Sequence, residues 1–161
     1  MCPEGRLSSP TREYRGRRIV DISTYTPYFL SAVNNALTRG ASKHYLEMFG
    51  VGIVEWRVVS MLAIEPRIPA SRMCEVIYLD KSGTSRALRN LWEQDFVEFE
   101  ASSADPRRKI WWLSRKGYKL HDRILEVALE RERKLVRGVD PEDLEVFLRV
   151  IRRMRANVDK L

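Results

Sequence analysis

Five basic side chains surround two adjacent tryptophans in the segment from residue 102 to 117, SSADPRRKIWWLSRKG. Indole rings favour burial, whereas guanidinium and ammonium groups favour water or an anion. A β-hairpin meets both demands when its stem packs on a core and its tip reaches for phosphate. Because side chains alternate along a strand, we expect Trp111 and Trp112 to point to opposite faces of the stem.

The tip of this expected hairpin carries residues suited to contact DNA. Arg107, Arg108 and Lys109 would be free to meet a phosphate backbone or to enter a minor groove. Asp105 stands two residues before Arg107, close enough to orient its guanidinium by a bidentate pair. The segment therefore predicts an anion-binding tip on a tryptophan-anchored stem.

The segment DKSGTSRALRNLWEQ, residues 80–94, predicts a second surface that could contact nucleic acid. Asp80 is a favourable N-cap, and the expected buried face consists of Ala87, Leu88, Leu91 and Trp92. Small hydroxyls and cations near a helix N-terminus can reach phosphates and base edges, and here they are Lys81, Ser82, Thr84, Ser85, Arg86 and Arg89. Alone, this pattern also suits an ordinary surface helix, but the basic hairpin that follows favours DNA binding.

The composition of the 161-residue chain, 44% hydrophobic and 32% charged, allows one domain with a sizeable core. A formal charge of +7 favours a polyanionic partner. No apolar run approaches the ~20 residues of a membrane span, and the N-terminus lacks the apolar stretch of a signal peptide. Cys2 and Cys74 are too few for a disulfide framework or a zinc site, so a reducing, cytoplasmic setting is expected.

The periodicity along the chain predicts a mainly α protein with a small β-hairpin. Residues 1–22 are basic, lack periodicity and are expected to form a flexible arm. Helices are expected from Thr26 to Met48, over 53–64, 69–79, 80–94 and 114–137, and from Asp140 to the chain end. Strands are expected over 96–101 and 109–114. This order is that of a winged helix-turn-helix module bracketed by long helices.

Four stretches resemble the MarR family of bacterial transcriptional regulators: GVGIVEWRVVSMLA (50–63), DKSGTSRALRNLWEQDFVE (80–98), DPRRKIWWLSRKG (105–117) and the helices from residue 118 onward. The spacing from D-x-R to L-S-x-x-G is the specific part of the resemblance. Gly83 departs from the family pattern, because the family more often has a hydroxyl or β-branched residue in this first turn of the reader helix. That departure puts the detailed base contacts in question, but not the fold.

The resemblance implies a triangular homodimer that binds a pseudo-palindromic operator in double-stranded DNA. Four regions follow: the arm (1–22), an N-terminal dimerisation and effector helix (23–50), the winged helix-turn-helix module (51–116) and C-terminal dimerisation helices (117–161). It implies that Arg107 reaches the minor groove and that Ser71 and Arg72 touch phosphates. The major groove would be read by Ser82, Thr84, Ser85, Arg86 and Arg89. Repression is the family's default.

Many members of the family respond to small aromatic acids or phenolics. The chain resembles the subgroup that controls aromatic-acid and hydroxycinnamate catabolism, whose effectors are free acids or CoA thioesters. An arginine can pair with a carboxylate and aromatic walls can stack on a ring, so the expected effector residues are Tyr28, Arg39, Ser42, His44, Tyr45, Trp56 and Trp112. Alternatively, Arg39 makes an intersubunit salt bridge and the tyrosines belong to the core.

Other classes of protein stay open at this stage. A redox-responsive regulator would need a reactive thiol, whereas Cys74 lies among apolar residues and is expected to be inert. A winged-helix adaptor would bind another protein instead of DNA, and a nucleoid-type protein would bind DNA without preferring a palindrome. The chain lacks the G-x-S-x-G, H-E-x-x-H, P-loop and G-x-G-x-x-G motifs, so we expect neither an enzyme nor a cofactor or metal.

Overall fold

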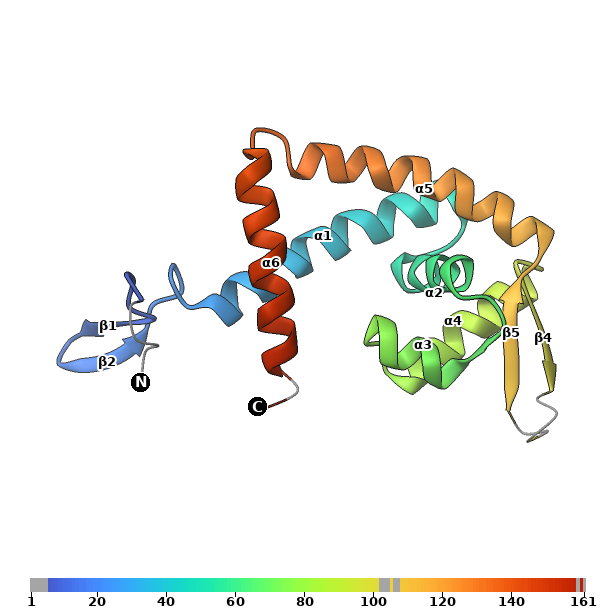
Figure 1. Cartoon of the computed structure of the whole chain (residues 1–161), viewed down its shortest axis with the longest axis horizontal. Coiled ribbons are helices and arrows are strands. Elements are labelled where there is room, and N and C mark those ends of the chain that lie inside the picture. The colour runs from blue at the N-terminus through green and yellow to red at the C-terminus, as the bar shows by residue number, and fades with distance from the viewer. Residues whose placement is uncertain (1–5, 102–104, 106–107, 159, 161) are drawn as a thin grey trace.

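The structure, a computed structural model, describes residues 6–101, 105, 108–158 and 160. The described chain is mainly helical (Figure 1). The helices and strands between residues 53 and 113 form a module at one end, which we call the reader module, and long helices extend away from it. The helices are α1 (Thr26–Phe49), α2 (Ile53–Ile64), α3 (Ala70–Ile77), α4 (Lys81–Glu93), α5 (Arg115–Leu135) and α6 (Pro141–Val158). The strands are β1 (Thr11–Tyr14), β2 (Arg17–Val20), β3 (Ile68–Pro69), β4 (Val97–Ala101) and β5 (Lys109–Leu113). The expected fold class is confirmed.

Helix boundaries follow the local chemistry that the sequence indicates. Pro27 occupies the first turn of α1, where its missing N–H costs nothing, and Gly50 ends that helix in the left-handed conformation. Asp80 caps α4 by accepting a hydrogen bond from the backbone N–H of Gly83 at 2.8 Å. Asp140 likewise accepts from the N–H of Glu142 just before α6.

The wing is a three-stranded antiparallel sheet in the order β3-β5-β4, not the two-stranded hairpin that the sequence predicts. The additional strand, Ile68–Pro69, pairs with Trp111 and Ile110 of β5. A two-residue strand has too few side chains to show a period of two, so its sequence carries no strand signal. Its effect is to tie the start of α3 to the stem of the wing.

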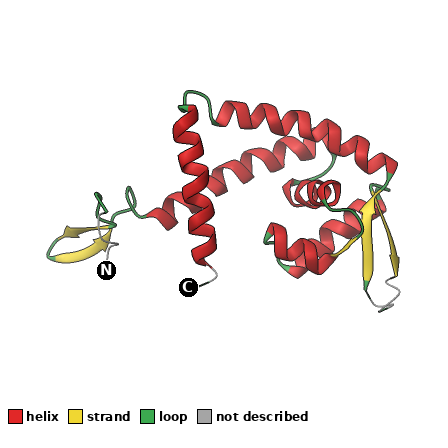
Figure 2. Ribbon diagram, viewed as in Figure 1, coloured by secondary structure: helices red, strands yellow, loops and turns green. Residues whose placement is uncertain are grey.

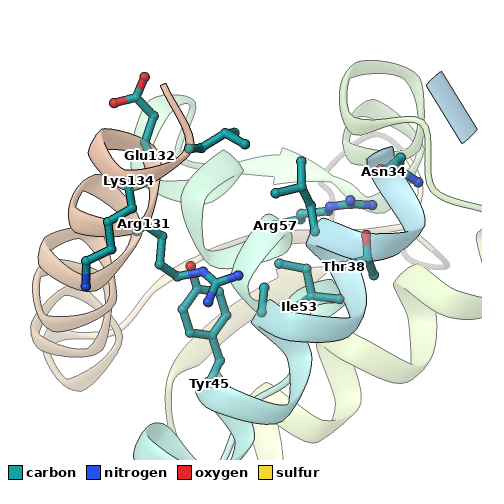
Figure 3. Close-up of a pocket in the computed structure, with 12 residues that line it drawn as sticks. Asn34, Thr38, Tyr45, Ile53, Arg57, Arg131, Glu132 and Lys134 are labelled. Carbon is teal, nitrogen blue, oxygen red and sulfur yellow. The ribbon is translucent and has the colours of Figure 1, made fainter. Parts of the chain in front are cut away.

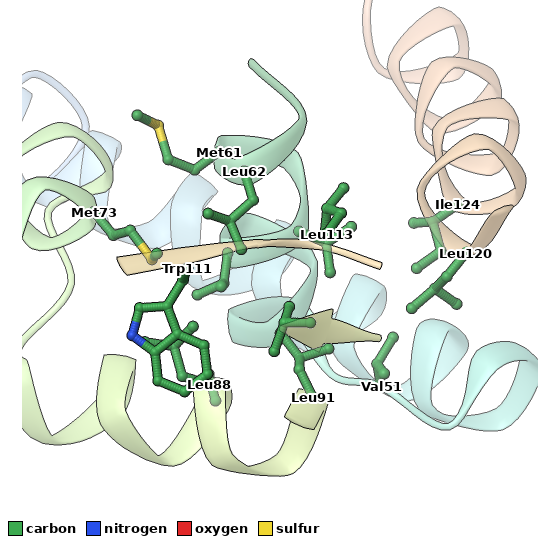
Figure 4. Packing of buried hydrophobic residues seen from close by; sticks show 14 of the residues in the cluster. Val51, Met61, Leu62, Met73, Leu88, Leu91, Trp111, Leu113, Leu120 and Ile124 are labelled. Atoms are coloured by element: carbon green, nitrogen blue, oxygen red, sulfur yellow. The ribbon is translucent and has the colours of Figure 1, made fainter. Parts of the chain in front are cut away.

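The core lies where α2, α3 and α4 meet β5 and the start of α5 (Figure 4). Trp111 is 7% exposed and packs beside Leu88 and Met73, which fixes the wing to the reader helices. Ala87, Leu88 and Leu91 are buried as expected. Trp92 was expected to be buried as well, but it is 51% exposed, and its ring lies tilted beside that of Phe99 of β4 with the centroids 5.8 Å apart.

Two residues of the L-S-x-x-G motif join the wing to α5. The Ser114 hydroxyl donates to the Asp95 carbonyl at 2.6 Å and accepts from the Gly117 N–H at 3.0 Å. Gly117 lies so close to the chain before β4 that a Cβ would stand 2.0 Å from the Phe96 carbonyl oxygen. The spacing of this motif is therefore a packing requirement at the root of the wing.

The N-terminal region differs from the flexible arm without regular structure that its composition predicts. Strands β1 and β2 form an antiparallel hairpin over residues 11–20, joined by a turn in which Arg15 and Gly16 both have positive φ. Figure 2 shows this hairpin beyond the N-terminal end of α1, at the opposite end of the chain from the wing. The strands lack an apolar/polar alternation because neither face is buried, so periodicity could not reveal them.

Candidate DNA-binding surface and effector cleft

Most of the expected DNA-contacting residues of α4 lie on its exposed face. Lys81, Ser82, Ser85, Arg86 and Arg89 are exposed, opposite the buried apolar residues of the same helix. Ser71, at the start of α3, is exposed too. A groove of about 370 Å³ brings β3, α3, α4 and β5 together, since it is lined by Pro69, Ala70, Ser71, Ser85, Leu88, Arg108, Lys109 and Trp111.

Thr84 is the exception on α4, and its expected place on the DNA-facing surface is wrong. Its side chain is 0% exposed. The Thr84 hydroxyl donates to the Asp80 carbonyl at 3.0 Å and accepts from the Cys74 thiol at 3.3 Å. The residue therefore joins α3 to the first turn of α4, and the hydrogen bond satisfies a polar group that would be costly to bury alone.

Arg72 is exposed but already held by carboxylates of its own chain. Its Nε lies 3.1 Å from Glu65 Oε1, and its Nη1 lies 3.9 Å from Glu75 Oε2. The hydrogen bonds and charge of Glu65 raise the pKa of Arg72. A phosphate would have to compete with these two carboxylates for the guanidinium.

At the wing tip, the structure places Asp105 beside Arg108. Asp105 Oδ2 lies 3.6 Å from Arg108 Nε, and the Arg108 N–H donates to the Asp105 carbonyl at 2.9 Å. Arg107, the expected minor-groove residue and the expected partner of Asp105, lies outside the described residues. Lys109 stands 3.8 Å from the centroid of the Phe99 ring, a contact that holds its charge at the base of the tip.

Trp111 and Trp112 point to opposite faces of β5, as expected. Trp112 is half-buried on the outer face, where its Nε1 donates to Glu98 at 3.0 Å. The Arg67 guanidinium lies over its ring, 4.8 Å from the centroid. Glu98 belongs to β4 and Arg67 directly precedes β3, so the structure does not bring Trp112 to the other expected effector residues.

A cleft of about 520 Å³ lies between α1, α2 and α5 (Figure 3). It is lined by Asn34, Leu37, Thr38, Ala41, Tyr45, Ile53, Arg57, Ala128, Arg131, Glu132, Lys134 and Leu135. Figure 3 shows Arg131 reaching from α5 to Tyr45, whereas Glu132 points away from the tyrosine. The walls are thus apolar, with two half-buried guanidiniums, of Arg57 and Arg131, as the charged groups of the interior.

Tyr45 forms the aromatic part of this cleft. Its side chain is buried, and the Arg131 guanidinium lies 5.9 Å from the ring centroid. Burial raises the pKa of the Tyr45 phenol, and the charge and hydrogen bond of Arg131 oppose that rise. Behind Tyr45 the aromatic contacts continue to Trp56 at 6.4 Å and from Trp56 to His121 at 5.6 Å.

The expected effector residues are only partly brought together. Tyr45 lines the cleft and Trp56 supports it from behind, while Tyr28, Ser42 and His44 are not among the lining residues. Arg39 is exposed and lines a separate hollow on α1 with Ala32, Asn35, Ala36 and Gly40. Sequence reasoning missed Arg57 and Arg131. Arg131 shares a helical face with Ala128 and Leu135, and this spacing could have indicated it.

The long helices leave many apolar side chains exposed. Described residues of α6 include none that is buried. Exposed apolar residues on α1 and α6 include Tyr28, Phe29, Leu30, Val33, Val146, Phe147 and Val150. Such contiguous apolar faces are typical of an interface with another chain. Near its C-terminal end, α6 also contacts the reader module, where the Arg155 guanidinium lies 3.8 Å from the centroid of the Tyr78 ring.

Neither a metal cluster nor a membrane-spanning helix is found in the described chain. Its His, Cys, Asp and Glu side chains form no group of three that could hold a metal ion. Across the same residues, every helix is too short or too polar to cross a bilayer. The described thiol, Cys74, is half-buried and donates a hydrogen bond to the Thr84 hydroxyl, while Cys2 lies outside the described residues.

Comparison with known proteins supports the resemblance seen in the sequence. Residues 49–108 match a model of the MarR family. The fold is similar to that of a MarR/EmrR family transcriptional regulator from Acinetobacter sp. ADP1, with 25% identity, a TM-score of 0.81, and coverage of 88% of this chain and 100% of that chain. No curated protein matches the sequence.

Two further structures show related folds in bound states. The PcaV transcriptional regulator from Streptomyces coelicolor, solved with its natural ligand, is 18% identical with a TM-score of 0.75, covering 87% of this chain and 98% of that chain. MepR from S. aureus, solved with DNA, is 19% identical with a TM-score of 0.75, covering 83% and 97%. Both likenesses extend over most of this chain and show that it shares the fold of these proteins.

Proposed function

We propose that this chain is a transcriptional regulator that binds a pseudo-palindromic DNA operator as a homodimer and releases it when an aromatic carboxylate enters the cleft. The observation that carries the proposal is the shared groove of α3, α4 and β5, which presents Ser71, Ser85 and Arg108 on one surface. No step of this function is catalytic, and it requires no cofactor.

DNA binding would use α4 in the major groove and the wing on the flanking backbone or minor groove. Ser82, Ser85 and Arg86 stand on the exposed face where base edges could be reached. Arg89 and Lys81 extend the same face toward phosphates. Thr84 and Arg72 are left out of this set, because one is buried and the other is paired with Glu65.

Dimerisation would cover the exposed apolar faces of α1 and α6. A two-fold axis between two reader modules would place their α4 helices in successive major grooves, so the operator should consist of two half-sites about one helical turn apart. The charge of α6 suits an antiparallel pairing, since acids occupy its first turn and arginines its last turns. We take repression as the mode of regulation, because a dimer on a promoter blocks polymerase by occupancy.

The effector would bind in the cleft between α1, α2 and α5. Arg131 is placed to pair with a carboxylate, and the Tyr45 ring offers a surface for an aromatic group. The volume of about 520 Å³ suits a single-ring acid such as a hydroxycinnamate, or the acyl end of its CoA thioester. Arg57 gives a second cation on the α2 wall.

The position of α2 explains how an effector could change DNA binding. Its residues Ile53 and Arg57 line the cleft, while Val58 and Leu62 of the same helix are buried in the core beneath α4. A ligand that binds better to a form with displaced reader helices must, by linkage, be bound less well when DNA is present. A coupling of about 1–3 kcal/mol corresponds to roughly 5- to 150-fold release.

The test is fluorescence anisotropy with a labelled duplex from the promoter region beside the gene. We expect tight binding to one palindromic site and release by p-coumarate, ferulate, protocatechuate or a CoA thioester. Arg131→Gln should abolish the response to the acid and keep the affinity for DNA within about 3-fold of the wild type. The control Arg39→Gln should keep both the response to the acid and the affinity for DNA.

Each failure has a distinct meaning. Specific DNA binding that no compound changes would discard the aromatic effector and keep the DNA reader. Binding without preference for a palindrome would identify a nucleoid-type protein. The absence of salt-dependent DNA binding would favour a winged-helix adaptor that binds another protein instead of DNA. Loss of binding on treatment with peroxide would favour the redox-responsive regulator.

A further inference from the structure

The β1–β2 hairpin is a concentration of positive charge that the proposed reader and cleft do not use. Residues 11–20 contain four arginines and one glutamate, a net charge of +3. None of these ten residues is buried. The matched family segment begins only at residue 49, so the hairpin lies outside it.

Three of the four arginines lie on the side of the hairpin that carries Tyr14. The strand register pairs Arg12 with Ile19 and Tyr14 with Arg17, which places these four side chains on the same face. The Arg15 guanidinium lies 5.2 Å from the centroid of the Tyr14 ring. The hairpin therefore has one face with three guanidiniums, which we call the arginine face.

Carboxylates of the described chain do little to compensate this face. No described salt bridge involves Arg12, Arg15 or Arg17. Arg12 lowers the pKa of Asp21, but more of that shift comes from Ser23, whose hydroxyl and N–H both donate to Asp21 Oδ1. Three neighbouring cations repel one another, and a polyanion would relieve that repulsion.

The hairpin is built to hold this face in a defined shape. Its turn consists of Arg15 at φ 50° and Gly16 at φ 69°, the left-handed pair that a two-residue hairpin turn requires. Its base is closed by the Asp21 N–H, which donates to the Pro10 carbonyl at 2.9 Å. At the same end, the Thr24 hydroxyl donates to the Ser9 carbonyl.

We propose that the arginine face is a second DNA-contacting surface, which binds phosphates of the backbone outside the segment read by α4 and the wing. The inference rests on the proposed DNA binding and extends it. Guanidinium forks match phosphate oxygens, and Tyr14 holds one of the forks in place by stacking. Figure 1 shows the hairpin beyond the N-terminal end of α1, at the opposite end of the molecule from the wing, so the phosphates that it contacts would lie outside those reached by the wing.

The experiment measures the salt dependence of binding to a labelled 30-base-pair duplex of random sequence, so it needs no operator. The test variant is Arg12→Gln/Arg15→Gln/Arg17→Gln in the full chain. Each phosphate contact contributes about 0.9 to the slope of log K against log salt, so the slope should fall by about 2 to 3 per protomer engaged. A matched control, Lys43→Gln/Arg133→Gln/Arg137→Gln, removes the same charge from exposed positions and should keep the slope within about 0.5.

Two additional readouts make the outcome unambiguous. The charge-preserving triple Arg→Lys variant at residues 12, 15 and 17 should retain most of the slope, and light scattering should give wild-type dimerisation for every variant. If the test variant keeps the wild-type slope, the inference is wrong, although DNA binding stands. A weaker dimer with an unchanged slope would assign the face to the partner subunit and overturn the inference. A wild-type chain without salt-dependent binding would instead overturn the proposed function.

Discussion

The protein has two basic β-hairpins at opposite ends, and they are held in opposite ways. The wing is fixed by a core: Trp111 is buried against α4, and β3 pairs with β5 on the side away from β4. The N-terminal hairpin has no buried residue from 11 to 20 and is closed mainly by hydrogen bonds at its base. The comparison shows that one chain can present cations either on a rigid extension of its core or on a free-standing ribbon.

The largest loss of unfolding free energy is expected for a substitution at the root of the wing, where the chain enters α5. Gly117→Ala forces a Cβ to within 2.0 Å of the Phe96 carbonyl oxygen, and backbone on both sides would have to move. We expect a loss of unfolding free energy on the order of 4–5 kcal/mol, measured by urea denaturation. Gly40→Ala is the control, because its Cβ meets only the end of the Arg131 side chain at 3.5 Å inside a helix. That variant should be neutral or more stable by up to about 1 kcal/mol.

The two tryptophans of the wing allow the comparison to be made within one strand. Trp111→Ala removes a buried ring from the core and should cost about 3–5 kcal/mol of unfolding free energy. Trp112→Ala removes a half-buried ring that contacts Arg67 and Glu98, so its cost should be about 1 kcal/mol. Equal costs for the two variants, measured by the same denaturation, would show that the outer face of β5 is covered in solution.

The sequence predicted the elements that pack on the core better than it predicted the exposed N-terminal hairpin. Helix caps and core faces carry strong local signals, so α2 was predicted residue for residue and Asp80 was correctly identified as a cap. The wing was predicted because its strands alternate and its tip is basic. β1 and β2 were missed because a ribbon with two exposed faces has no alternation. For the cleft, Arg131 was missed and Arg39 chosen, because sequence spacing on α1 cannot reveal which α5 residues oppose it.

Thr84 shows a different limit of sequence reasoning. A threonine among serines and arginines near a helix start has the composition of a DNA-reading face. Its burial depends on Cys74 of the preceding helix, which approaches only after α3 and α4 have packed. Tertiary contacts of this kind decide whether a small hydroxyl faces solvent or the core.

The pH dependence of stability should also differ between the reader module and the N-terminal region, because each has an aspartate with a lowered pKa. The Gly83 N–H lowers the pKa of Asp80, and the Ser23 side chain lowers that of Asp21, below the usual value of 3.8 in both cases. A depressed folded-state pKa stabilises the fold above the unfolded value, and this contribution is lost as pH falls through the folded pKa. Asp80→Asn keeps a capping side chain but removes the titration, so thermal stability should decline less steeply below about pH 4 than in the wild type. Asp21→Asn should leave that pH dependence of global unfolding unchanged, because its hairpin contributes nothing to the core.

The smallest expected effect on global stability comes from the turn of the free-standing hairpin. Gly16 has φ 69°, a conformation that a β-branched residue adopts only with strain, so Gly16→Val should melt a ribbon that is marginal on its own. Because residues 11–20 bury nothing, the free energy of global unfolding should change by less than about 0.5 kcal/mol. Hydrogen exchange should then show faster exchange of the β1 and β2 amides and unchanged protection in β4 and β5. A global loss comparable to that of Trp111→Ala would mean that the hairpin is packed against a second subunit, and the two hairpins would then differ in which chain holds them rather than in whether they are held.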